Sequence, residues 1–180
     1  MVEQGRYSEA TKLAEEALMV IEKEFGNNHP NVAVALNNLA LLYSTQGKYS
    51  EAQSLYMRAL AINEEAFGQD HPEVATSLNN LALLYFIRGK YSEAESLYIR
   101  ALAIDQKAFG EHNAKVAADL NNLVELYRAQ AEYAETEPLL GPSLQYWTKP
   151  LDQTIPMWRL FARIWQNFTG ISAKKMKPKS

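Results

Sequence analysis

Two histidines of this 180-residue chain, His29 and His71, are the first candidates for chemistry, because imidazole serves as a metal ligand and as an acid–base catalyst. Each histidine precedes a proline, and the two lie 42 residues apart. Neither has carboxylates or further histidines nearby at the spacing of a metal site, which needs several ligands around one ion. The sequence therefore predicts a turn and helix-capping role for both histidines and no metal site.

Three serines, Ser8, Ser50 and Ser92, repeat at the same interval, but no base stands beside them to activate a hydroxyl nucleophile. Gln53 follows Ser50 by three residues and Glu95 follows Ser92, which is the pattern of a capping box at a helix N-terminus. The sequence also contains no glycine-rich phosphate-binding loop. We therefore predict no catalytic residues, no cofactor and no enzymatic activity.

Pairs of asparagines carry a different kind of chemistry. The phrase LNNL occurs at residues 36–39, 78–81 and 120–123. An asparagine amide offers both a donor and an acceptor, so it can pair with the main chain of a bound peptide without requiring one particular side chain. The alternative is that one asparagine of each pair bonds the neighbouring repeat and stabilises the stack, and both interpretations stay open.

A 42-residue period organises the elements that must position these residues. The phrase GKYSEA at residues 47–52 returns as GRYSEA at 5–10 and GKYSEA at 89–94, and a diverged copy stands at 131–136. A fixed period of this size is typical of repeat architectures, in which each unit buries its apolar face against its neighbours. With 47% apolar residues, the chain can form such a core.

Each repeat unit has the pattern of two helices. The first helix is expected from Pro30 to Gln46, because its apolar residues recur at three- and four-residue spacing, and Gly47 ends it. The second is expected from Ser50 to Phe67, where Gly68 ends it. The apolar residues of the two helices are Val32, Leu36, Leu39, Ala40, Tyr43, Ala52, Leu55, Tyr56, Ala59, Leu60 and Ile62. The sequence predicts an all-α fold of antiparallel helix pairs.

The pattern within one unit resembles the tetratricopeptide repeat, on the residues Leu39, Ala40, Tyr43, Gly47, Tyr49, Ala52, Tyr56 and Ala59. The phrases NNLALLY, GKYSEA and RALAI, together with the longer period, are similar to the repeats of kinesin light chain over residues 1 to about 140. The resemblance implies a right-handed superhelical solenoid whose first helices line a concave groove for an extended peptide. The groove residues that it implies are Asn37, Asn38, Leu41, Asn79, Asn80, Leu83, Phe86, Asn121, Asn122 and Arg128.

The expected function is therefore a protein–protein interaction scaffold with a protein or peptide as its partner. The groove has one basic candidate, Arg128, and lacks the dense lysine and arginine set that would clamp a carboxyl terminus or nucleic acid. Self-association through the open solenoid ends is a further mode, and a membrane partner is not expected, because no apolar run is long enough to span a bilayer. The chain has no cysteine, which fits a cytoplasmic location. The alternative function is a structural or sensor repeat segment of a larger signalling protein without a groove ligand.

The repeat boundaries predict a partial first unit at residues 1–28, then units at 29–70, 71–112 and 113–140. Met1 aligns with Tyr43, so the first unit lacks its first helix within this sequence. Its second helix, at residues 6–24, should pack an apolar face on the helix that begins near Pro30, and one flank should stay open. We place Leu13, Ala14, Ala17 and Leu18 on that packed face.

Residues 141–180 form a divergent tail, with seven basic residues against one acidic residue and all three tryptophans of the chain. An amphipathic helix over residues 156–168 is one interpretation. In the other, codons for residues 151–158 read one nucleotide earlier can spell LGPDHPDV, the inter-repeat loop of this pattern. This indicates a frameshift near Leu140-Gly141, in the gene or in its sequencing, and the coding DNA decides between the two.

Overall fold

The computed structural model describes residues 2–129, which form six α-helices and no strand. The chain divides into two compact units, residues 1–108 and 109–180. The helices of the first unit are α1 (Val2–Phe25), α2 (Pro30–Thr45), α3 (Tyr49–Phe67), α4 (Pro72–Ile87) and α5 (Tyr91–Phe109), and α6 (Ala114–Ala129) belongs to the second. The predicted boundary at residue 140 and the tail lie outside the described residues.

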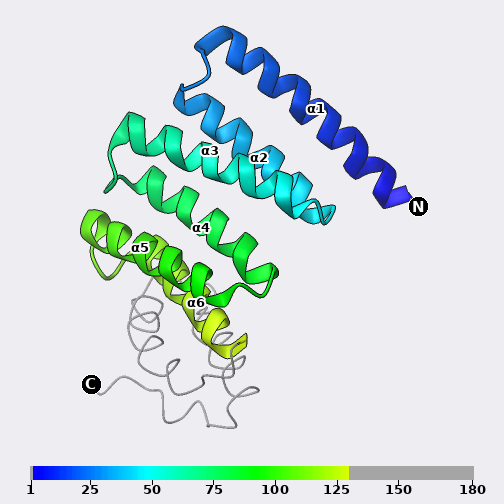
Figure 1. Ribbon diagram of the computed structural model, residues 1–180. Helices are drawn as coiled ribbons and strands as arrows, with labels where there is room; N and C mark the ends of the chain where they lie inside the picture. Colours follow the sequence, from blue (N-terminus) through cyan, green and yellow to red (C-terminus); the bar gives the residue numbers. More distant parts are fainter. Residues whose placement is uncertain (1, 130–180) are drawn as a thin grey trace, which may run out of the picture. The chain divides into compact units, whose positions relative to one another are not determined.

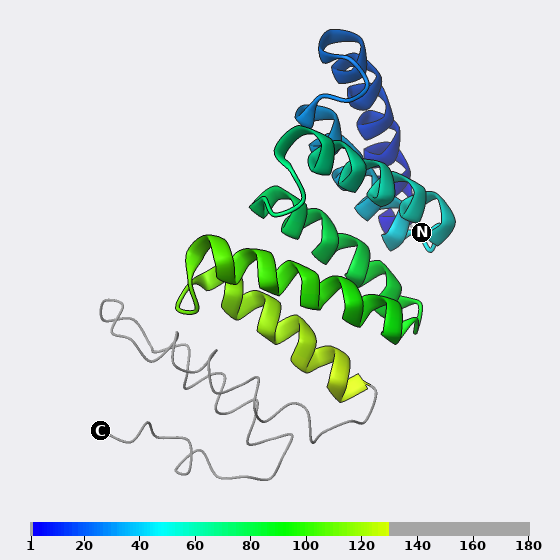
Figure 2. The same ribbon diagram turned by 60° about the vertical axis from the view of Figure 1, so that its left-hand side comes forward.

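Consecutive helices of the first unit run antiparallel and pack side by side (Figures 1 and 2). Three apolar clusters join them. The first brings Leu18 of α1 and Leu36 of α2 together with Ile62 of α3. The second joins α2 and α3 to α4 through Ala40, Ala52, Tyr56, Leu81 and Leu84, and the third joins α4 to α5 through Val74, Ala75, Leu78, Ala101 and Ile104. Each helix is thus stabilised by its neighbours, and the all-α repeat architecture is confirmed.

Glycine ends the first helix of the repeats at residues 29–70 and 71–112, as the sequence predicts. Helix α2 ends at Thr45, and Gly47 follows with φ of +75°, a left-handed conformation that glycine adopts without a steric penalty. The Lys48 amide then donates to the Tyr43 carbonyl at 2.9 Å, which closes the turn into α3. Lys90 and Tyr85 repeat this bond at the same distance.

The histidines cap the first helices. The Nδ1 atom of His29 accepts a hydrogen bond from the Asn31 amide at 3.1 Å, and that of His71 accepts one from the Glu73 amide at 3.2 Å. In the third copy, the Oδ1 atom of Asn113 accepts from the Lys115 amide at 2.8 Å. The predicted capping role is confirmed, and asparagine replaces histidine where the loop sequence changes.

The predicted capping box at Ser50 is wrong. Helix α3 begins at Tyr49, one residue earlier than expected, and its N-cap residue Lys48 makes no side-chain capping bond. Ser92 lies likewise inside the first turn of α5, where its hydroxyl donates to the adjacent Glu93 carboxylate at 3.0 Å. The tight turn after the glycine brings the backbone into helical geometry before the serine is reached.

Helix α1 packs on α2 through a narrower face than the sequence suggests. Leu18 is buried, and Ala14 and Ile21 pack against the same cluster. Leu13 and Ala17, which we placed on that face, are instead exposed. An apolar stripe on one helix can pack against two neighbouring helices, and here α2 covers only one side of the α1 stripe.

Candidate functional site

The candidate site is a face formed by one exposed stripe on α2 and the matching stripe on α4. Helices α2 and α4 are in contact, and the two stripes occupy the same repeat positions. Four apolar side chains stand out from it: Val34 is 57% exposed, Leu41 51%, Leu83 43% and Ile87 50%. The polar members of the two stripes are Asn38, Thr45, Thr76 and Asn80.

The two asparagines of each pair have different surroundings. Asn38 is exposed on the α2 stripe, and Asn80 is half-buried at the equivalent place on α4. Asn37 turns further inward, and its Oδ1 atom is covered by protein without accepting a hydrogen bond from the described residues. On α2, the second asparagine is therefore the one whose amide is accessible at the surface.

Phe86 and Arg128 lie one residue outside the stripe. Phe86 is half-buried, with its ring centroid 5.8 Å from that of Tyr91. On α6, the Arg128 guanidinium pairs with Glu125 of the same helix at 3.2 Å. Asn121 and Asn122 are both half-buried on α6, which belongs to the second unit. The structure thus places Asn38, Leu41, Asn80 and Leu83 of the expected residues on one face.

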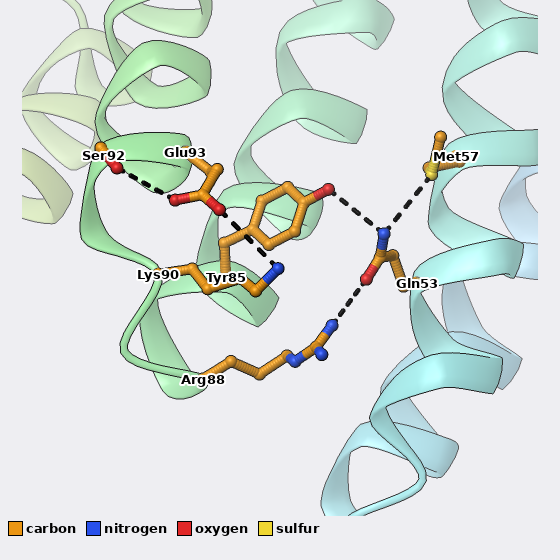
Figure 3. Close-up of polar contacts among 7 residues, drawn as sticks. All are labelled: Gln53, Met57, Tyr85, Arg88, Lys90, Ser92 and Glu93. Carbon is orange, nitrogen blue, oxygen red and sulfur yellow. Dashed lines mark hydrogen bonds and ion pairs between the residues drawn. The ribbon is translucent and has the colours of Figure 1, made fainter.

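The face between α2 and α4 is nearly neutral. Helix α2 carries no charged residue, and the only one of α4 is Glu73 in its first turn. The Arg88 guanidinium, just beyond α4, donates to the Gln53 amide oxygen at 2.6 Å, while Lys90 pairs with Glu93 at 3.7 Å (Figure 3). Both basic groups have partners, and the face itself presents mainly apolar and amide side chains.

The described residues contain no group of three or more histidine or acidic side chains placed to hold a metal ion. Within the same range, every helix is too short or too polar to cross a membrane. Both findings concern residues 2–129.

A hollow lies between α1 and α2, at residues that the sequence does not mark as a site. Its volume is about 370 Å³. It is lined by Ala14, Ala17, Ile21, Phe25, Asn31, Val34, Ala35 and Asn38. The apolar spacing of Ala17 and Ile21 was visible in the sequence, but nothing local says that this side of α1 is left uncovered.

Comparisons with known proteins agree with this architecture. The model of the tetratricopeptide repeat family matches residues 2–65, 49–107 and 73–145. The crystal structure of BtubC (BKLC) from P. vanneervenii aligns with a TM-score of 0.78 and 27% identity, over 96% of this chain and 67% of that chain. A Podosopora anserina kinesin light chain with nearly identical TPR-like repeats aligns with a TM-score of 0.74 and 24% identity, over 97% and 82%. The comparison with curated proteins gives no match.

The matches to the family model follow one another along the chain and span every described helix. The solved structures extend the likeness to repeats of the kinesin light chain kind. The 42-residue period, the paired helices and the glycine turns all agree with it. The chain belongs to the tetratricopeptide repeat family, with repeats like those of kinesin light chain.

Proposed function

We propose that the face formed by α2 and α4 binds an extended peptide segment of another protein. Repeats of this family are in general scaffolds for protein–protein interaction. The observation that carries the proposal is the set of exposed apolar side chains around Asn38 and Asn80: Leu41 and Leu83 occupy the same repeat position, and Val34 on α2 and Ile87 on α4 extend the two stripes. Exposed apolar side chains gathered on one face mark a surface that gains from being covered.

The apolar side chains and the asparagine amides are expected to contribute to binding in different ways. Covering the apolar groups contributes about 25 cal/mol for each Å² removed from water, and it selects apolar ligand side chains. The asparagine amides can donate to peptide carbonyls and accept from peptide amides, which orients an extended main chain. Asn122 stands at the corresponding sequence position of α6, so the pattern recurs in the repeat at residues 113–140.

The expected ligand is a neutral, apolar segment and not an acidic or carboxyl-terminal one. The face offers no unpaired arginine or lysine within α2 or α4 that would hold a carboxylate. For the same reason we propose no nucleic-acid partner. A binding role without catalysis, in a cytoplasmic protein, is the function that this chemistry supports.

Peptide selection followed by mutation tests the proposal. Peptides are selected from a random 12-residue display library on the full chain, and the best binder is measured by fluorescence anisotropy. Leu83→Asp should weaken its binding at least tenfold, because a buried charge would replace an apolar contact. Asn38→Ala combined with Asn80→Ala should weaken it by about three- to tenfold, as expected for one or two lost hydrogen bonds.

Ile99→Asp on α5 is the matched control. Ile99 is exposed like Leu83 but belongs to the second helix of its unit, away from the two stripes. It should leave the affinity within twofold. Equal losses for Ile99→Asp and Leu83→Asp would contradict a site on α2 and α4.

The alternative, a structural or sensor segment without a groove ligand, gives a different result. No library peptide would then depend on Asn80, and Asn80→Ala would lower the melting temperature instead. Self-association through the open ends is a second binding mode, and the exposed apolar side chains of α1 favour its N-terminal end. Molecular mass measured by light scattering over a range of concentrations tests it.

A further inference from the structure

The exposed stripes of α2 and α4 can be compared level by level, because each residue of one has a counterpart 42 places along in the other. The two middle levels are alike. Asn38 corresponds to Asn80, and Leu41 corresponds to Leu83. These levels offer the same groups on both helices, so they do not give the face a direction.

The two outer levels differ between the helices. Near the helix starts, Val34 of α2 corresponds to Thr76 of α4, and at the helix ends Thr45 corresponds to Ile87. All four side chains are exposed. Thr76 is exposed although α2 packs beside α4, so exposure at this level belongs to the repeat itself.

The two threonines are poor places for an apolar ligand side chain. The Thr45 hydroxyl donates to the Leu42 carbonyl at 2.8 Å, and the Thr76 hydroxyl donates to the Pro72 carbonyl at 3.2 Å. Each hydroxyl oxygen also has lone pairs that water can reach at the surface. An apolar group placed over them would remove that hydration and return no hydrogen bond.

Helices α2 and α4 run in the same direction, because both are antiparallel to α3 (Figures 1 and 2). The exposed apolar side chains consequently follow one diagonal of the face. It runs from Val34 near the start of α2, between Leu41 and Leu83, to Ile87 at the end of α4. The other diagonal ends at the two threonines.

We propose that the bound peptide crosses α2 and α4 along the apolar diagonal, and that the two outer levels select its direction and its sequence pattern. This inference deepens the proposed function and rests on it. The levels of Val34 and Ile87 lie about 16 Å apart along the helix axes, at a rise of about 1.5 Å per residue. Neighbouring helices add a sideways step of about 10 Å.

The length of the diagonal defines the ligand. It is about 19 Å, which an extended chain covers with about six to seven residues at roughly 3.3 Å each. Side chains of an extended chain alternate between its two faces. The ligand segment should therefore carry apolar side chains at both ends and near its middle, all on the face that meets the protein.

The test uses the 12-residue peptide selected on the full chain, with affinities from fluorescence anisotropy. Val34→Thr combined with Ile87→Thr removes the apolar ends of the diagonal and should weaken binding at least fivefold. Thr45→Val combined with Thr76→Val is the matched control on the other diagonal and should leave affinity within twofold. All these side chains are β-branched, so helix propensity changes little, and circular dichroism melting checks the fold.

Photocrosslinking shows the crossing directly. Alanine scanning of the peptide first identifies its apolar core, which should span about six to seven residues. A benzophenone side chain is then placed at one end of this core or at the other. Mass spectrometry should locate one crosslink near Val34 and the other near Ile87.

Crosslinks near Thr45 and Thr76 would overturn the diagonal, as would equal effects of the two double variants. Leu83→Asp separates this failure from failure of the binding face itself. If Leu83→Asp weakens binding while the two double variants act alike, the face binds the peptide but does not select its direction. If no selected peptide depends on Leu83, both proposals are wrong.

Discussion

The junction between α1 and α2 and the junction between α3 and α4 share one backbone plan but differ in their polar chemistry. Both bury the same leucines, Leu36 and Leu39 in the first and Leu78 and Leu81 in the second. Both also begin the first helix with a capping histidine and end it at a glycine turn. The apolar positions and the turns therefore define the repeat.

The polar contacts at the two junctions use different partners. In the first, the Tyr43 hydroxyl donates to the Glu15 carboxylate at 2.5 Å, and the Gln46 amide donates to Thr11 at 2.6 Å. In the second, the Tyr85 hydroxyl accepts from the Gln53 amide at 3.3 Å (Figure 3). Met57 stands where Glu15 would be repeated, so the second tyrosine has no carboxylate at that place.

Another pair of equivalent positions is apolar at one junction and polar at the other. The first junction has Ile21 and Ala35, which are apolar, while the second has Asn63 and Ser77, which are buried and joined by a 2.8 Å hydrogen bond. Both arrangements fit the same backbone. In the second junction the two polar side chains are hydrogen-bonded to each other, and in the first both positions are apolar, so neither leaves a polar group without a partner. Polar contacts in this array are thus exchangeable in pairs, whereas the leucines are not.

The largest expected effect tests the shared leucines. Leu81→Ala should lower the free energy of unfolding by about 2–5 kcal/mol, because it leaves a cavity in a packed core. Leu39→Ala, its counterpart, should fall in the same range. Urea denaturation followed by circular dichroism measures both. A loss below half a kilocalorie for Leu81→Ala would place this leucine on the surface and overturn the helix phasing.

The next-largest expected effect tests whether a hydrogen-bonded polar pair can be replaced by an apolar pair. Asn63→Ile should cost about 1–3 kcal/mol, because it removes the donor to the buried Ser77 hydroxyl and adds bulk. Adding Ser77→Ala should recover most of that loss, since the double variant reproduces the apolar pair of the first junction. A double-mutant cycle in urea measures the coupling, and strictly additive losses would contradict exchange in pairs.

The tyrosine contact of the first junction predicts a pH dependence. The hydrogen bond to Glu15, together with burial, raises the pKa of Tyr43 from 10.0 to about 12. A raised pKa means that the folded state holds this proton more tightly. Its contribution to stability is therefore complete below pH 10 and is lost as the pH rises toward 12.

Tyr43→Phe tests this dependence. The variant should lose about 1 kcal/mol at neutral pH, the size of one hydrogen bond, and its stability should fall less steeply than that of the wild type between pH 10 and 12. Glu15→Gln should bring the profile close to that of Tyr43→Phe, because the carboxylate is gone. Melting temperatures across this pH range measure the difference, and parallel profiles for wild type and variant would contradict it.

The smallest effect concerns an ion pair that repeats between the second helices of successive repeats, from α1 to α3 and from α3 to α5. Arg58 pairs with Glu22 at 2.6 Å, and Arg100 pairs with Glu64 at 2.6 Å. These groups are partly exposed, so Arg58→Ala and Arg100→Ala should each cost about 0.2–1 kcal/mol, and the cost should shrink in high salt. Thermal melting at low and high salt measures it. A loss of several kilocalories at one position alone would show that the repeated pairs are not equivalent.

Local signals in the sequence determined the fold of this protein. Pro30 and Gly47 mark the limits of α2, and His29 and His71 directly precede α2 and α4. The 42-residue period fixes the order of the repeats. Proline, glycine and capping side chains act on the backbone within a few residues, so their effects follow from sequence alone. The stripe of Asn38, Leu41, Asn80 and Leu83 could be predicted in the same way, because its positions repeat with the helix.

Only the tertiary structure decided which sides of those helices are covered. Leu13 and Ala17 are as apolar as Ala14 and Leu18, yet the first two are exposed, while Leu18 is buried and Ala14 packs on the core. It also separated Asn37, whose amide oxygen is covered, from Asn38, which is exposed. The physical reason is that burial depends on the neighbour that a face meets. A helix with an apolar stripe cannot specify by itself how many neighbours will pack against it.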